Sequence, residues 1–450
     1  MMEVLVMTTY LSKLKEKIKD KTAKISVIGC GYVGTTLGVG FTQNEFKVNG
    51  YETSSLRISQ LREMMDKPEY QLLRFNVTDD PFHIKFSDIV IITVPTPLSK
   101  RGLPDLSYID EALKGLPSMK GKLVVLESTV PIGVTRSVVQ KSLEKDDVVV
   151  GENCFLGFSP ERVDPNNQDF TIHDVPKVTS GISKGCADLT NKLYKKITKT
   201  VPVSSVECAE AVKLLENSSR MVGIALIQEF AQYASKIGLD IWEICEGANT
   251  KPYGILPLYP SAGVGGHCIG VDSTALAWSA RQENFTLGLV EKALAVHNSV
   301  PFHIVGMVEK AIDTTQLSGL AGSKVLLVGA SYKPEVADSR ESACRDIWKL
   351  LEDRRATVQY YDPLIKSMHL TKDRTVDSIS LTEKNIREVD CVVICQPFSI
   401  SSQVSWEGVP LTWLNLFMEA NAIVDCCNVY KKNVKFYFPK DESKRKVFSI

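Results

Sequence analysis

Short apolar runs separated by polar or glycine-rich turns recur through the first half of the chain. They cover residues 24–28, 46–51, 86–94 and 123–126. The run at 86–94 (FSDIVIITV) is almost continuously apolar, which is typical of a buried strand in a parallel sheet, and the run at 123–126 repeats the pattern. A helix of small and apolar residues follows the first run. Residues 24–205 are therefore predicted to form an α/β domain.

Longer stretches carry apolar residues three and four positions apart. Residues 206–237 have this spacing without interruption and predict one long helix. Residues 287–313 predict a second, with a kink before Pro301 because proline cannot donate the helical hydrogen bond. Residues 11–21 (LSKLKEKIKDK) alternate apolar and charged positions, which indicates a short solvated helix rather than a membrane anchor.

Strand-like runs return in the second half, at residues 323–328, 357–362, 389–395 and 422–425. The predicted fold is α/β, with two Rossmann-like, doubly wound parallel-sheet domains joined by a long central helix. The predicted segments are a leader at 1–23, a first α/β domain at 24–205, a central helical dimerisation domain at 206–313 and a second α/β domain at 314–450.

Composition narrows the classes of function. The 450 residues contain 53 Lys and Arg and 53 Asp and Glu, so no charge excess favours nucleic acid or a membrane surface. Eleven scattered cysteines, an odd number, do not indicate a disulfide framework, and no paired CxxC motif indicates zinc. The apolar N-terminus is short for a signal peptide, and no run is long enough to span a bilayer. These features favour the cytoplasm and a site without metal.

The first strand runs into Gly29-Cys30-Gly31-Tyr32-Val33-Gly34, and a helix follows. In this context GxGxxG predicts a dinucleotide site, because Gly29 makes the turn, Gly31 admits the pyrophosphate and Gly34 lets the helix pack on the strand. The phosphates then face the helix N-terminus. Glu52, about 20 residues on, is placed to bind the ribose hydroxyls. Its charge favours NAD over NADP, since it would repel a 2′-phosphate.

The central loop Gly263-Val264-Gly265-Gly266-His267-Cys268 leads into Ile269-Gly270-Val271-Asp272. Three glycines in four positions permit a tight turn. If a helix begins near Cys268, its N-terminus lowers the thiol pKa and favours the thiolate. Taken alone, the pattern fits a buried structural cysteine equally well.

Polar residues at other predicted strand ends and on the long helix add candidates. Thr96, Thr129 and Glu161-Arg162 follow strands, where ligands bind in such sheets; hydroxyls there also cap helices, which is their more frequent role. Lys213 and Asn217 lie four apart and share a helix face. An exposed charge stripe is the simpler interpretation of that helix alone.

The ordered motifs VIGCGYVG, VPTP, ESTVPIG, SPER, AEAVKLLEN, GVGGHCIGVD and YKP…DSRES resemble those of the UDP-glucose/GDP-mannose dehydrogenase family, from Lys24 to about Val429. Within it, His267 before the cysteine and Val271 before the acid resemble the branch that acts on UDP-N-acetylhexosamines. The resemblance implies a four-electron, NAD-dependent oxidation of the sugar C6 alcohol to a carboxylate. It also implies a role in surface polysaccharide synthesis and a homodimer or higher homo-oligomer built on the long helix.

The resemblance also implies residue roles. Cys268 resembles the nucleophile that carries a thiohemiacetal and then a thioester, and Lys213 the cation that steadies the C6 oxygen. Asn217 and Asp272 would position that oxygen and a water, and Glu161 would assist thioester hydrolysis. The positions matching cofactor contacts are Gly29, Gly31, Tyr32, Val33, Gly34, Glu52, Arg57, Thr96, Thr129 and Arg340. Those matching sugar-nucleotide contacts are Arg162, Val163, Lys213, Asn217, Arg220, Lys251, Tyr259, Gly265, Tyr332 and Lys333.

Some positions depart from the family pattern. Gly270 stands where proline is usual, Glu52 where aspartate is usual, and Cys427 where a basic residue usually helps to hold the nucleotide. UDP-glucose is the alternative substrate. A one-step hydroxyacid dehydrogenase would not need Cys268, and a sugar-nucleotide sensor would bind NAD and UDP-sugar without forming NADH.

Overall fold

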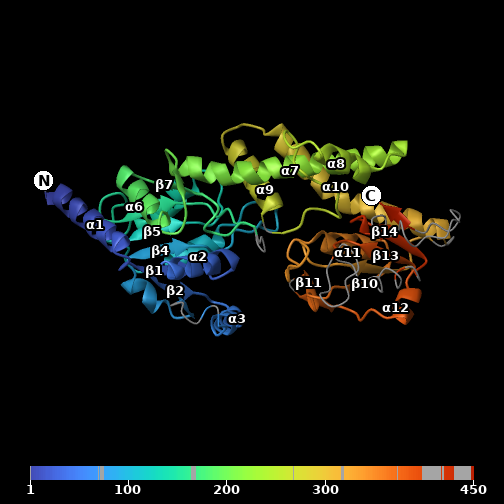
Figure 1. Cartoon of the computed structure of the whole chain (residues 1–450), viewed down its shortest axis with the longest axis horizontal. Coiled ribbons are helices and arrows are strands. Elements are labelled where there is room, and N and C mark those ends of the chain that lie inside the picture. The colour runs from blue at the N-terminus through green and yellow to red at the C-terminus, as the bar shows by residue number, and fades with distance from the viewer. Residues whose placement is uncertain are drawn as a thin grey trace. The chain divides into compact units, whose positions relative to one another are not determined.

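The computed structural model describes residues 2–68, 70, 75–163, 169–266, 268–315, 319–371, 373–397, 417, 420–429 and 447–449. The chain divides into two compact units. Unit 1 comprises Met1–Asn217 and Val271–Thr286, and unit 2 comprises Ser218–Gly270 and Leu287–Ile450. The long helix α7 (Val206–Ile237) and helix α9 (Ile269–Gln282), both labelled in Figure 1, each contribute residues to both units.

Unit 1 is built on an eight-stranded sheet in the order β3-β2-β1-β4-β5-β6-β7-β8. Its strands are β1 (Lys24–Ile28), β2 (Lys47–Tyr51), β3 (Phe75–Thr78), β4 (Ile89–Ile92), β5 (Leu123–Leu126), β6 (Phe155–Phe158), β7 (Lys177–Gly181) and β8 (Thr200–Pro202). All neighbouring strands are parallel except β6 and β7, which pair antiparallel. The strand order reverses between the neighbouring strands β1 and β4. Ligands bind at this position in doubly wound sheets.

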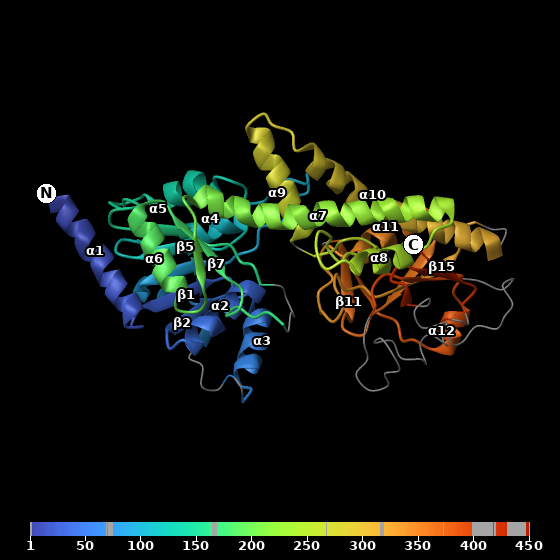
Figure 2. The ribbon, with the colours of Figure 1, turned by 45° about the horizontal axis from the view of Figure 1, so that its top comes forward.

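Two apolar layers cover this sheet. One is formed with α1 (Met2–Lys19), α2 (Tyr32–Gln43), α3 (Ser55–Met65) and α6 (Lys184–Tyr194), whose buried side chains share one cluster with β1 and β2. The other contains α4 (Ser107–Lys114), the 3-10 helix η1 (Pro81–Phe86), the π-helix η2 (Thr135–Gln140), α5 (Lys141–Leu143) and the start of α7. Figure 2 shows α2 and α3 beside the sheet. Burial on both faces explains why the central strands are apolar throughout.

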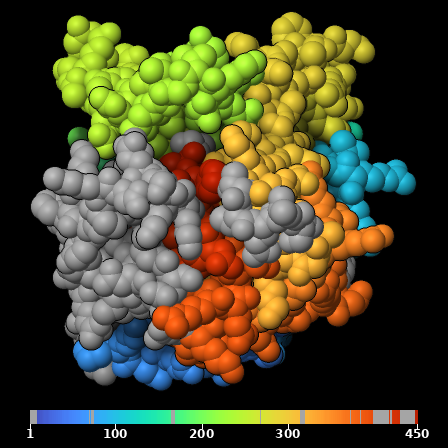
Figure 3. All heavy atoms as spheres, turned by 90° about the vertical axis from the view of Figure 1, so that its right-hand side faces the viewer, coloured from blue at the N-terminus to red at the C-terminus, as the bar shows by residue number. Residues whose placement is uncertain are grey.

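Unit 2 contains a five-stranded parallel sheet in the order β10-β9-β13-β14-β15. Its strands are β9 (Lys324–Val328), β10 (Thr357–Tyr361), β13 (Cys391–Ile394), β14 (Ala422–Asp425) and β15 (Val447–Ser449), and β11 (Ser367–Thr371) and β12 (Arg374–Asp377) form a separate hairpin. Its helices are α8 (Ile241–Asn249), α10 (Gly288–Thr315), α11 (Ala343–Asp353) and α12 (Glu383–Arg387). In Figure 3 the green atoms at the top belong to the α7–α8 region and the orange atoms below to the sheet region of this unit.

The predicted fold class is confirmed, and several elements have the predicted bounds. The strands β1, β5 and β14 and the helix α7 begin and end where the sequence indicates. Three expectations were wrong in detail. The run at 86–94 contains a strand only at Ile89–Ile92, because η1 occupies the residues up to Phe86. The first helix extends back to Met2, and the first sheet is mixed rather than wholly parallel.

No helix in the described part of the chain is long and apolar enough to cross a membrane.

Candidate active site

The turn between β1 and α2 has the geometry that a dinucleotide phosphate requires. Gly29 adopts φ +86°, and a Cβ on Gly34 would lie 2.1 Å from the carbonyl oxygen of Gly29. At Gly31 a Cβ would meet no atom within 4 Å, so open space lies beside this backbone. The N-cap residue of α2 is Gly31, which has no side chain to cap the helix. The start of the helix therefore fits an anionic group, as the pyrophosphate of NAD would be.

Glu52 follows β2 and reaches across to this turn. Its Oε2 accepts a hydrogen bond from the backbone N–H of Cys30 at 3.0 Å, and its Oε1 accepts two from the N–H groups of Thr53 and Ser54. The Nε of Arg57 donates to the carbonyl oxygen of Cys30 at 3.0 Å. Glu52 and Arg57 both lie at the glycine turn, and their contact with the cofactor stays a prediction.

The loops after β4 and β5 meet at the same edge of the sheet. The Thr96 hydroxyl donates to the carbonyl oxygen of Thr129 at 2.7 Å, and the Ser128 hydroxyl donates to that of Val94 at 2.7 Å. Thr93 donates to the Gly29 carbonyl oxygen at 2.6 Å, which ties this edge to the glycine turn. The predicted cofactor contacts Thr96 and Thr129 therefore lie side by side.

A buried acid marks the junction of α7 and α9. Asp272, in the first turn of α9, is 3% exposed and accepts a hydrogen bond from the Nδ2 of Asn217 at 2.5 Å. Burial raises the pKa of Asp272 to about 7, although the charge of Lys213 and the bond from Asn217 act in the opposite direction. The structure thus groups Lys213, Asn217 and Asp272, as the resemblance implies.

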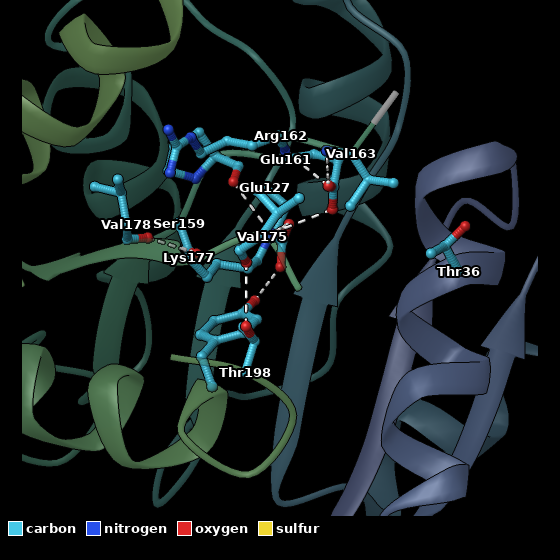
Figure 4. A network of polar contacts seen from close by, with 12 residues as sticks. Thr36, Glu127, Ser159, Glu161, Arg162, Val163, Val175, Lys177, Val178 and Thr198 are labelled. Carbon is cyan, nitrogen blue, oxygen red and sulfur yellow. Dashed lines mark hydrogen bonds and ion pairs between the residues drawn. The ribbon is translucent and has the colours of Figure 1, made fainter. Parts of the chain in front are cut away.

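Glu161 lies in a second buried polar group of unit 1, shown in Figure 4. Its Oε1 accepts from the backbone N–H groups of Arg162 at 2.7 Å and Val163 at 2.6 Å, and its Oε2 accepts from the Nζ of Lys177 at 3.2 Å. The guanidinium of Arg162 forms an ion pair with Glu216 at 2.6 Å. Glu161 is therefore held rigidly at the end of a strand, where an acid can act on water.

Cys268 is exposed and directly precedes α9, so the predicted helix start is confirmed. The glycines before it pack closely within unit 2: a Cβ on Gly265 would lie 2.8 Å from that of Tyr332, and one on Gly266 would lie 2.6 Å from the Tyr332 ring. The Asp338 carboxylate holds the pKa of Arg340 above its usual value, with a smaller contribution from Cys268. Gly265, Cys268, Tyr332 and Arg340 are therefore grouped in unit 2.

The remaining predicted contacts are more scattered. In unit 2, Tyr259 stacks on Trp242 with centroids 5.7 Å apart, and the Nζ of Lys251 lies 5.0 Å from the Tyr253 ring. Arg220 is exposed and Lys333 half-buried. His267 lies outside the described residues. Cys268 belongs to unit 2, whereas Glu161, Lys213, Asn217 and Asp272 belong to unit 1; their convergence on one substrate stays a prediction.

Comparison with known proteins identifies the family. Residues 23–198, 207–299 and 326–432 match, in order, the NAD binding, central and UDP binding domains of the UDP-glucose/GDP-mannose dehydrogenase family. The chain belongs to this family. The glycine turn, Glu52 and the loop threonines described above lie within its NAD-binding domain, so the expected cofactor is confirmed at the level of the family.

Alignments with curated members of the family cover most of the chain. The UDP-N-acetyl-D-glucosamine 6-dehydrogenase of Pseudomonas aeruginosa is 31% identical over 77% of this chain and 84% of the relative. The UDP-N-acetyl-D-mannosamine dehydrogenase of Pyrococcus horikoshii is 29% identical over 91% and 96%. The solved structure of the UDP-D-ManNAc dehydrogenase from that organism has a TM-score of 0.78 at 25% identity and covers 95% of this chain and 99% of its own.

Sequence reasoning missed several buried polar residues of this dehydrogenase. Lys177 donates to both Glu161 and Glu127, and Tyr194 donates to Glu127. Asp362 accepts from the N–H groups of Ala330 and Ser331 at the corresponding turn of unit 2. Glu127 directly follows a strand, which is a usable signal, but nothing in the local sequence marks Lys177. Among the described residues, no cluster of three or more His, Cys, Asp or Glu side chains is arranged to hold a metal ion.

Proposed function

We propose that this protein oxidises the C6 alcohol of a UDP-N-acetylhexosamine, of the UDP-ManNAc or UDP-GlcNAc type, to the uronate with two molecules of NAD. The observation that carries the proposal is the buried Asp272, bonded to Asn217 and in the field of Lys213, in the first turn of the helix that Cys268 precedes. The names of the relatives support an acetamido sugar, because the Pseudomonas and Pyrococcus proteins are named for UDP-GlcNAc and UDP-ManNAc.

Bound NAD would supply the acceptor for both hydrides. Gly29, Gly31, Gly34, Glu52, Thr96 and Thr129 are the residues proposed to hold it, with Tyr32, Val33, Arg57 and Arg340 as further contacts. The chain itself binds the sugar nucleotide, orients the C6 carbon and moves protons. As the first hydride leaves, the ammonium of Lys213 stabilises the negative charge that develops on the C6 oxygen.

Cys268 retains the aldehyde. Its thiolate adds to the C6 carbon while the carbonyl oxygen takes up a proton, which gives a thiohemiacetal. Loss of the second hydride and the hydroxyl proton leaves a thioester on the sulfur. Glu161 then accepts a proton from water as the water oxygen attacks, the C–S bond breaks, and the carboxylate product and the Cys268 thiol are released.

We also propose the assembly and the compartment. Exposed apolar side chains on α7 suit an interface with a second copy of the chain, so a homodimer or higher homo-oligomer is expected. All eleven cysteines belong to the described residues and none forms a disulfide, which favours the reducing cytosol. The segments 1–23, 24–205, 206–313 and 314–450 are retained as the proposed domain division.

The decisive experiment counts NADH. The protein is incubated with NAD and, in turn, UDP-ManNAc, UDP-GlcNAc, UDP-GalNAc and UDP-glucose. We expect two NADH per acetamido sugar consumed and no free aldehyde, and Cys268→Ala is expected to lower the rate at least about 100-fold. Cys208→Ala, at another exposed cysteine, is the matched control and keeps the wild-type rate.

Three results would contradict the proposal. One NADH per sugar with release of aldehyde would show a two-electron enzyme. Full turnover by Cys268→Ala would show that the thiol takes no part. Binding of NAD and UDP-sugar, seen as shifts in melting temperature without NADH, would indicate a sensor.

A further inference from the structure

Lys177 is a fully buried cation whose three donor hydrogens all have acceptors. Its side chain is 4% exposed, and the residue is the first of β7. Its Nζ lies 2.6 Å from the Oε2 of Glu127 and 3.2 Å from the Oε2 of Glu161. The third acceptor is the carbonyl oxygen of Pro160 at 3.1 Å. An ammonium has three N–H bonds, so these acceptors fix its position and orientation.

The contacts of Glu161 leave one carboxylate oxygen less occupied than the other. A carboxylate offers about four lone-pair directions. Oε1 uses two for the N–H groups of Arg162 and Val163, whereas for Oε2 the described residues supply the single bond from Lys177. Oε2 is therefore the oxygen that can still accept a proton from water. The ammonium of Lys177 is the side-chain donor that the described residues supply to this oxygen.

We propose that Lys177 is a positioning residue for thioester hydrolysis, holding Oε2 of Glu161 toward the attacking water, and that Glu127 and Tyr194 hold Lys177 in place. This rests on the proposed function, since it assigns Glu161 the proton from that water. Lys177, Glu127 and Tyr194 touch neither substrate nor cofactor in this role. Their effect passes through the Glu161 carboxylate, to which Lys177 is joined, and Figure 4 shows Lys177 with Glu127 and Glu161.

Glu127 and Tyr194 make a rigid base for the ammonium. The Tyr194 hydroxyl donates to Oε1 of Glu127, and the Tyr194 ring lies 5.2 Å from the Nζ of Lys177. Glu127 and Tyr194 are 1% and 0% exposed. One cation thus faces two carboxyl groups in a buried space, where a full second negative charge is costly.

The charges of this group support a division of roles between the two acids. Burial, opposed by Lys177 and reinforced by Glu161, raises the pKa of Glu127 to about 7. Glu127 can therefore carry a proton near neutral pH. Glu161 instead accepts hydrogen bonds from two backbone N–H groups, whereas the contacts described for the Glu127 carboxyl come from the side chains of Lys177 and Tyr194.

The test separates hydride transfer from hydrolysis. Lys177→Met removes the charge and donors but keeps most of the side-chain volume. Because this leaves two buried acids without their cation, Lys177→Met with Glu127→Gln is made as a second variant that removes one of these charges. Lys177→Arg restores a cation and N–H donors. Lys192→Met, at an exposed ion pair with Asp188 on α6, is the matched control.

Each variant is mixed with NAD and the UDP-sugar that the wild type consumes, and quenched with acid at set times. Intact-protein mass spectrometry measures the acyl group on Cys268, and absorbance measures NADH. For both Met variants we expect near-normal formation of the first two NADH, accumulation of acyl-enzyme, and hydrolysis slower by about 10- to 100-fold. Lys177→Arg is expected to recover part of the loss, and Lys192→Met to behave as wild type.

Melting temperature, measured in parallel, reports the purely structural contribution. Folded variants with wild-type hydrolysis, or with both hydride transfers slowed as much as hydrolysis, would overturn the role of Lys177. Failure of both Met variants and of Lys177→Arg to fold would assign Lys177 to stability alone and overturn it too. A wild type that forms no NADH with any of the sugars would instead contradict the proposed function itself, and the role of Lys177 with it.

Discussion

At the scale of single residues, unit 1 buries two carboxyl groups, Asp272 and Glu127, whose pKa is raised to about 7 in each case. The first cause is burial, which disfavours the charged form. Neither acid is compensated fully by its cation, Lys213 or Lys177. Such acids reduce the stability of the fold at neutral pH. Active sites often contain acids of this kind, because a group whose pKa is close to the working pH can take up and release protons.

Because the pKa of Asp272 is raised, we expect the free energy of unfolding to depend on pH. This pKa rises from 3.8 to about 7 on folding. Between these values the folded state holds a proton that the unfolded state releases, so the free energy of unfolding falls as pH rises through this window and levels off above it. Asp272→Asn removes this loss. The variant is expected to match the wild type near pH 4 and to be more stable at pH 8, by a few kcal/mol and about 4 at most.

Chemical denaturation at several pH values measures the difference, and Asp110→Asn, at an exposed position on α4, is the control. Turnover by Asp272→Asn should fall by about 10- to 100-fold even where the protein is more stable, because the acid no longer positions the C6 oxygen. A stability difference that does not change between pH 4 and pH 8 would show that Asp272 does not titrate as described.

At the scale of elements, the β1–α2 turn separates the packing role of a glycine from its binding role. A Cβ at Gly34 would lie 2.1 Å from the Gly29 carbonyl oxygen, a backbone atom that cannot turn aside as a flexible side chain could. A Cβ at Gly31 would meet no atom within 4 Å, and its φ of −65° is open to alanine. Each substitution by alanine adds one methyl group, but only the methyl group at position 34 would collide with other atoms of the protein.

We therefore predict opposite patterns for the two variants. Gly34→Ala should destabilise the protein by about 1–3 kcal/mol and weaken NAD binding as a consequence. Gly31→Ala should leave the free energy of unfolding within about 0.5 kcal/mol of wild type but weaken NAD binding at least about 10-fold, because its methyl group occupies the space for the pyrophosphate. Denaturation and calorimetric titration with NAD measure both quantities. Normal NAD affinity in Gly31→Ala would place the phosphates elsewhere.

Elements whose sequence pattern and burial agree were predictable. The strands β1 and β5 are apolar runs between turns, and α7 keeps its helical spacing from Val206 to Ile237. The strand β7 (KVTSG) was missed because it begins with a charged residue and is largely polar, although four of its residues are buried. Lys177 in this strand forms a hydrogen bond with Glu127, which is fifty positions away in the chain. A local sequence pattern cannot predict such a long-range contact.

The candidate site divides in the same way. Gly29, Glu52, Lys213 and Asn217 belong to motifs with fixed spacing, so the sequence placed them correctly on their elements. The burial of Asp272 was not predictable, because it depends on packing around the start of α9. Cys268 was expected before a helix from the apolar run that follows it, and the helix begins one residue later.

At the scale of the whole molecule, the two sheets repeat one local design. Gly29 follows β1 and Gly329 follows β9, both with φ +86°, and their N–H groups bond to Tyr51 and Tyr361 at 2.9 Å. Glu52 and Asp362 then follow the neighbouring strands, and each accepts from the N–H groups of its turn. The family assigns NAD to the first domain and UDP to the second, so the same turn design occurs in both nucleotide-binding domains.

An apolar surface on α7 is not covered by the described residues of either unit. Leu226, Phe230, Tyr233 and Ile237 are exposed on α7 by 64%, 38%, 55% and 48%. Their spacing of four, three and four residues places them on one face of the helix, and the rings of Phe230 and Tyr233 lie 6.1 Å apart. A continuous exposed apolar stripe of this kind marks a protein contact. Pairing with the same stripe of a second copy would bury all four side chains at once.

We predict that Leu226→Glu with Tyr233→Glu prevents the proposed assembly and gives folded monomers. Burying two added carboxylates against their symmetric copies in a second chain is expected to raise the dissociation constant at least about 100-fold. Sedimentation velocity over a range of concentrations measures it, and circular dichroism confirms that α7 remains helical. Ser235→Glu, exposed on the same helix but about half a turn away from Tyr233, is the control and should keep the wild-type mass. A wild type that is monomeric at every concentration, or a double variant that assembles like Ser235→Glu, would show that this stripe is not the interface between copies.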